Sequence, residues 1–120
     1  MIEETINPFI PEIHLFHDRG LYGEFCKREL GGYEDLGGNG QTHYADGTAA
    51  VLICTPDEGD VPSEFALIAH ESYHVLCMHF EYLGVKDYDD EIVAYAIQAI
   101  SGSICAAHME WLEKAGKAAV

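Results

Sequence analysis

Three titratable residues lie close together inside an otherwise apolar stretch of the chain. The segment from Ser63 to Gly84, SEFALIAHESYHVLCMHFEYLG, contains His70, Glu71 and His74. On a helix the two histidines lie on one face, one turn apart, so their imidazole nitrogens can converge on a single metal ion. Glu71 is rotated by about 100° around the helix axis, where it can reach a water bound to that metal. The H-E-x-x-H spacing therefore predicts two zinc ligands and a general base.

A tetrahedral zinc site that keeps a position for water needs a third protein ligand. We expect this ligand in DDEIVAYAIQAI, which begins the next predicted helix. If the two long helices pack antiparallel, Glu91 enters near the second half of the first helix and can reach the histidine pair. Asp90 is the alternative ligand, although Asp89 and Asp90 are also well placed to cap the helix. A structural role for Glu91, as a first-turn acid that complements the helix dipole, stays open.

A hydrolytic site also needs a donor for the developing oxyanion, and no spacing argument selects one. The candidates, each of which has a structural role as its more frequent alternative, are Tyr44, Tyr95, His43, His79 and His108. Tyr73 lies on the motif helix but is expected to point away, and His14 and His17 are expected at the surface or at a strand edge. The alternative without a metal makes His70 and His74 hydrogen-bonded core residues and turns Glu71 to solvent.

The elements that must position these residues follow from hydrophobic periodicity and turn signals. A brief alternation predicts a strand at Ile13–Phe16, and a short helix is expected over residues 21–30. In QTHYADGTAAVLICTP the ADG turn predicts a β-hairpin whose second strand is buried. The motif helix follows the hairpin and is expected to be buried almost all round. A second long helix is expected from residues 89–90 to about 114. We expect an α+β domain spanning residues 1–120, a minimal zincin-like fold with a small antiparallel-containing sheet on two long helices and an N-terminal arm at 1–11.

Several local signals refine these boundaries. Asp60 or Ser63 is expected to cap the start of the motif helix, and Gly84 is expected to end it. Gly102 predicts either a kink or close packing in the second long helix. The glycine-rich GGYEDLGGNG follows no strand and opens no helix, so it does not predict a phosphate-binding loop. It is expected to be irregular, either as a lid over the metal or as a surface excursion.

HESYH followed by EIVAY resembles the gluzincin branch of the zinc metallopeptidases. The resemblance covers roughly residues 42–103 and implies that His70, His74 and Glu91 bind Zn²⁺ while Glu71 activates water. It also implies that the strand TAAVLIC lies along the cleft and pairs with extended substrate. The compact length is similar to small zincin-like proteins encoded in bacterial and phage genomes.

The chain departs from this family in two ways. Many gluzincins carry an aspartate four residues after the glutamate ligand, where this chain has Tyr95. That aspartate orients a histidine ligand, so a backbone carbonyl or Asp90 is expected to do so here. Within these 120 residues we also expect no counterpart of the C-terminal subdomain that usually supplies an oxyanion-stabilising side chain.

The formal charge of −15, from 21 acidic and 6 basic residues, argues against binding of nucleic acid. The four cysteines form no CxxC pair and are expected to be reduced, and no run is expected to approach a membrane span. With no signal peptide, a cytoplasmic protein is expected, or a virion-associated one if the gene belongs to a phage. The predicted function is a zinc metallopeptidase acting on a peptide or protein. The alternatives are a non-catalytic zinc-binding structural or assembly protein with a protein partner, and an acidic inhibitor that mimics nucleic acid.

Overall fold

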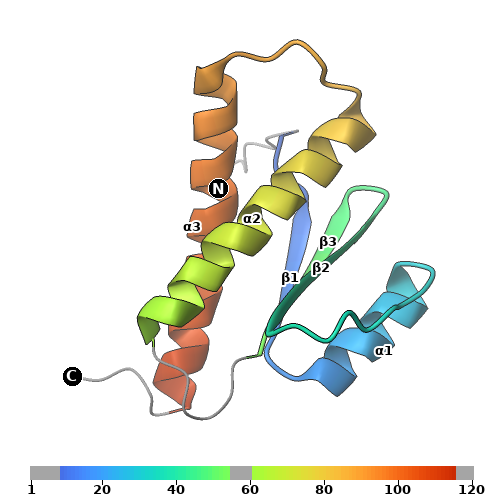
Figure 1. The fold of residues 1–120 in the computed structure, drawn as a ribbon, viewed down its shortest axis with the longest axis vertical. Helices are drawn as coiled ribbons and strands as arrows, with labels where there is room; N and C mark the ends of the chain where they lie inside the picture. The colour runs from blue at the N-terminus through green and yellow to red at the C-terminus, as the bar shows by residue number, and fades with distance from the viewer. Residues whose placement is uncertain (1–8, 55–60, 116–120) are drawn as a thin grey trace, which may run out of the picture.

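A computed structural model describes residues 9–54 and 61–115 of the chain. The elements follow the order strand, helix, two strands and two helices that the sequence predicts (Figure 1). Their bounds are β1 Glu12–Phe16, α1 Arg19–Glu29, β2 Gly40–Ala45, β3 Thr48–Ile53, α2 Val61–Leu83 and α3 Asp90–Lys114. The α+β class and the two long helices are thus confirmed.

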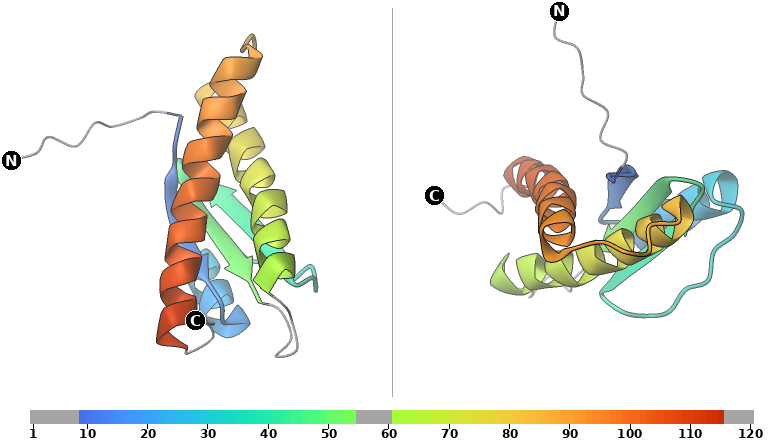
Figure 2. Two further views of the ribbon diagram at one scale, coloured as in Figure 1. Left: turned by 90° about the vertical axis from the view of Figure 1, so that its left-hand side faces the viewer. Right: turned by 90° about the horizontal axis from the view of Figure 1, so that it is seen from above.

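The three strands form one mixed sheet in the order β1-β3-β2. The hairpin strands β2 and β3 pair antiparallel, while β1 pairs parallel with β3. In Figure 2 the helices α2 and α3 lie on one face of the sheet and α1 lies on the other. The expectation that β3 borders a cleft and pairs with substrate is wrong, because β3 is the central strand. The strand next to the motif helix is β2, at the sheet edge.

The central position of β3 explains its continuous apolar sequence. Ala49, Val51 and Ile53 pack into the core beneath α2 and α3, whereas Ala50 and Leu52 pack against Tyr22 and Cys26 of α1. A strand covered on both faces has no side for polar residues, so the alternation expected of a half-exposed strand disappears. The hairpin turn carries Asp46 and Gly47 with φ of 47° and 88°, as the ADG signal predicts.

Helix ends follow local side-chain chemistry. The Asp18 carboxylate accepts a hydrogen bond from the Leu21 N–H at 2.9 Å, so α1 begins two residues earlier than expected. Asp89 caps α3 in the same way through the Ile92 N–H at 2.9 Å, which confirms its capping role, whereas Asp90 is the first residue of the helix. Gly84, with a φ of 74°, ends α2 as predicted.

One predicted cap of α2 is wrong, and the other cannot be placed. Because α2 begins at Val61, Ser63 lies inside the helix and does not cap it. Asp60 falls outside the described residues.

The motif helix α2 is not buried almost all round, as its sequence suggested. Its core face contains Ile68, Val75, Leu76 and Phe80, but a second face is exposed from Ser63 to Cys77. Among the described elements, α2 packs against α3, β2 and β3 on one side, and none covers its other face. A largely apolar composition therefore leaves apolar side chains in solvent.

The helix α3 corrects the expectation that no run approaches a membrane span. Among the described residues it is the one helix that is long and apolar enough to cross a membrane, judged by length and composition alone. Its mean hydropathy over 18 residues is 1.4. Only 22% of that window is buried. Gly102, predicted to kink the helix or admit close packing, is exposed, and no described atom lies within 4 Å of where a Cβ would stand.

All four cysteines are free thiols. Burial raises the pKa of the Cys26 and Cys105 thiols above the ordinary value, which disfavours their thiolate forms. These two side chains therefore behave as small apolar residues, as their sequence surroundings indicate.

Candidate metal centre

His70 and His74 converge as the helical spacing predicts. Their Nε2 atoms lie 3.2 Å apart, and the rings meet at 71°. Two nitrogens bound to one tetrahedral zinc ion at 2.0–2.1 Å lie roughly 3.3 Å apart. The pair therefore has the spacing of two ligands of one metal. The same distance also fits a direct hydrogen bond between two neutral imidazoles.

The histidine pair lies at the surface rather than inside the core. The His70 side chain is 65% exposed, and His74 is also exposed. The prediction of a helix buried almost all round therefore fails at the two histidines predicted to bind zinc. The metal-free alternative placed the histidines in the core and Glu71 in solvent. Glu71 is instead buried, with only 3% of its surface exposed.

The β2 edge strand holds the Glu71 carboxylate in place. The Thr42 hydroxyl donates a hydrogen bond to Glu71 Oε1 at 2.7 Å, and Glu71 Oε2 lies 4.0 Å from His70 Nε2. One carboxylate oxygen is thus held by the edge strand, while the other lies on the side of His70. Thr42 was not among the predicted site residues. Its position two residues before Tyr44, on the same strand face, is the only signal that could have indicated it.

Gly40 is required for the close approach of β2 to Glu71. A Cβ at this position would lie 2.9 Å from Glu71 Oε2 and 2.9 Å from the Leu67 side chain. Both neighbours belong to α2, so the strand can approach the helix only where it lacks a side chain.

We expect Gly40→Ala to destabilise the fold by about 1–3 kcal/mol, because the added methyl group overpacks this contact. The measurement is urea unfolding followed by circular dichroism. Gly38→Ala is the matched control, since the nearest described atom to its added Cβ would be 3.4 Å away. Equal stability of the two variants would contradict the close approach.

Two adjoining cavities flank the candidate site. One of about 540 Å³ is lined by residues that include Asn39, Ser63 and Ala66. The other, of about 370 Å³, is lined by residues that include Leu36, Thr42, His74 and Met78. Both are also lined by Gly40, His70 and Glu71. A ligand can therefore reach the Nε2 atoms and the Glu71 carboxylate from a hollow between α2 and the sheet edge.

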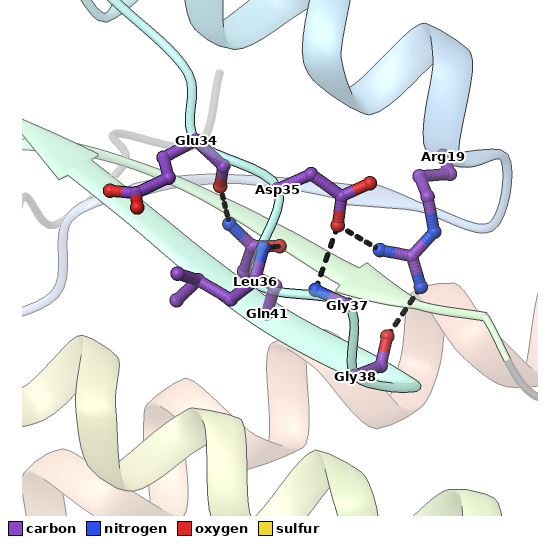
Figure 3. Close-up of polar contacts among 7 residues, drawn as sticks. All are labelled: Arg19, Glu34, Asp35, Leu36, Gly37, Gly38 and Gln41. Atoms are coloured by element: carbon purple, nitrogen blue, oxygen red, sulfur yellow. Dashed lines mark hydrogen bonds and ion pairs between the residues drawn. The ribbon is translucent and has the colours of Figure 1, made fainter.

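The glycine-rich segment before β2 is held against α1. Arg19 donates one hydrogen bond to Asp35 Oδ1 at 2.9 Å and another to the Gly38 carbonyl (Figure 3). The same Asp35 oxygen accepts from the Gly37 N–H at 2.8 Å. Gln41 is bonded to the backbone of residues 34 and 36. In this arrangement the segment forms a wall of the cavities rather than a lid over the histidines.

The structure does not bring the predicted third ligand to the pair. Among the described residues, no three His, Cys, Asp or Glu side chains gather at a point that could hold a metal ion. Glu91 and Asp90 are both exposed in the first turn of α3. The facing ends of α2 and α3 lie apart and are joined by residues 84–89 (Figures 1 and 2). Glu91 as a ligand therefore stays a prediction from the sequence.

The predicted oxyanion donors do not converge on the histidine pair. Tyr95 is 68% exposed on α3, and His43 lies on the α1 side of the sheet, with its ring near Tyr33. The Tyr44 hydroxyl lies 2.5 Å from His79 Nδ1 in a partly buried contact, and burial raises the pKa of Tyr44. Tyr73 is 60% exposed, as expected for a residue that points away.

A second titratable cluster was missed by the sequence interpretation. His108 is fully buried, with Nδ1 2.9 Å from His17 Nε2 and Nε2 3.5 Å from Glu64 Oε1. The His17 ring stacks on Trp111, with centroids 3.8 Å apart. His17 follows the edge strand β1, as expected, and its ring also packs against this buried cluster. The cluster joins the end of β1 to α2 and α3, which is a structural role for His108.

Comparison of the chain with protein-family models, with curated proteins and with solved structures finds no match.

Proposed function

We propose that this protein binds zinc through His70 and His74 and acts as a metal-dependent hydrolase of peptide bonds in which Glu71 is the general base. The observation that carries the proposal is the 3.2 Å approach of the two Nε2 atoms beside the buried Glu71 carboxylate. Both histidines are exposed and border the cavities, so the pair is open to a metal ion and to a ligand.

A zinc ion held there would supply a bound water of lowered pKa and polarise a substrate carbonyl. Glu71 Oε2 lies on the side of His70, where it can take a proton and return it to the leaving amine. The Thr42 hydroxyl holds Oε1, which limits rotation of the carboxylate and keeps Oε2 oriented. In this proposal Glu71 is the base and Thr42 orients it. None of the predicted oxyanion donors converges on the histidine pair.

A second candidate function is non-catalytic zinc binding in an assembly or interaction protein. Two observations favour it. The histidine pair is exposed, and among the described residues no third ligand side chain gathers with it. Metal ligands at a surface can be completed by another molecule, and zinc then links the two.

Zinc titration by calorimetry of chelator-treated protein tests the metal site. We expect the wild-type chain to bind zinc and to gain thermal stability, because zinc binds the folded state in preference. His74→Ala should lose this binding, whereas His14→Ala, which removes a partly exposed histidine outside the pair, should retain it. No zinc binding by the wild-type protein would overturn the metal site and both functions built on it.

A further inference from the structure

The surface around the histidine pair has the character of an interface. The exposed side chains of α2 between residues 63 and 77 are all uncharged, because the two acids in this stretch, Glu64 and Glu71, are buried. Two large apolar side chains add to it: Leu36 is 70% exposed and borders the cavity beside the pair, and Tyr73 is 60% exposed on α2. Such an uncharged surface is unusual in a chain with a formal charge of −15.

The coordination chemistry of the pair indicates what covers this surface. Zinc prefers four ligands in a tetrahedral arrangement, and the pair supplies two nitrogens. A second copy of the chain, related by a two-fold axis that passes between the histidines, would supply the other two. In such an isologous contact the same patch is used twice, so His70 of each copy lies near His74 of the other.

We propose that one zinc ion bridges two copies of this chain through His70 and His74 of each, with Leu36 and Tyr73 packed at the edges of the contact. The exposed residues of the described α2 face between 63 and 77 carry no carboxylate, which limits the repulsion between two strongly acidic molecules there, while Glu34 and Asp35 adjoin the contact beside Leu36. This inference rests on the zinc-binding part of the proposed function. A bridged dimer fills all four zinc positions, so it is a closed form of the site that must separate before a substrate can bind zinc.

Molar mass and zinc content, measured together on the full chain, test this bridge. Zinc chloride added to chelator-treated protein should double the molar mass and leave one zinc ion per two chains. A chelator should restore the monomer. His70→Ala should remain monomeric with zinc present. Leu36→Glu and Tyr73→Glu should bind zinc but form fewer dimers, because each places a negative charge in the contact. Leu21→Glu, on an exposed residue of α1, is the matched control and should dimerise as wild type does.

The possible results separate this inference from the proposed function. One zinc ion per monomeric chain would overturn the bridge and leave the hydrolase proposal standing. A dimer that persists in chelator would overturn the bridge and indicate a contact that needs no metal. No zinc binding would overturn both proposals.

Discussion

Replacing Glu71 by glutamine is expected to lower peptide hydrolysis by a factor of about 10²–10⁴ while zinc binding is retained. Glutamine has the shape of glutamate and can still accept the Thr42 hydrogen bond, so the fold and the position of the side chain should survive. It cannot take a proton from water at neutral pH. The measurement is cleavage of an unbiased peptide library by zinc-loaded protein, diluted until it is monomeric.

Glu81→Gln provides the matched control for this substitution. Glu81 is an exposed glutamate on the same helix, and its replacement changes the net charge by the same amount. It should leave hydrolysis unchanged. Cleavage by the Glu71 variant at the wild-type rate would contradict the role of Glu71 as the base. Zinc binding without any cleavage by the wild-type monomer would favour the non-catalytic function.

Replacing His108 by leucine is expected to destabilise the fold by about 3 kcal/mol and to lower the melting temperature by roughly 10 °C. The imidazole is fully buried, where it contacts His17 at 2.9 Å and faces the Glu64 carboxylate at 3.5 Å. Leucine fills the volume but removes the contact with His17 Nε2 and places an apolar group beside the buried Glu64 carboxylate. Thermal and urea unfolding followed by circular dichroism measure the effect.

His14→Leu is the control for the His108 substitution. The His14 side chain is 38% exposed, with its Nε2 3.1 Å from the exposed carboxylate of Glu12 and its ring 4.6 Å from that of Phe25, an apolar contact that leucine can keep. Surface pairs of this kind contribute at most about 1 kcal/mol, so the control should change stability little. If His108→Leu is as stable as His14→Leu, the buried cluster does not hold β1, α2 and α3 together.

The order and approximate extent of the elements could be predicted from the sequence because they depend on local signals. The hairpin turn at Asp46 and Gly47, the Asp89 cap and the end of α2 at Gly84 each act within a few residues. The same holds for the histidine pair, since helical geometry alone brings residues four apart to one face.

The rest of the site depends on contacts between distant parts of the chain. Thr42 meets Glu71 across 29 positions, and His17 meets His108 across 91. No local pattern predicts which strand lies beside the motif helix. We therefore expected β3 at the cleft, whereas β2 lies there. The sequence position of Glu91 could not show how far apart the facing ends of α2 and α3 would be.

By itself, the sequence determined that His70 and His74 lie on one face of a helix with Glu71 beside them. Only the tertiary structure decided that the pair is exposed while Glu71 is buried beneath β2. The physical reason is that helix periodicity sets relative directions of side chains, whereas exposure depends on which other elements pack against each face. In this chain β2 covers Glu71, and nothing in the described residues covers the two histidines.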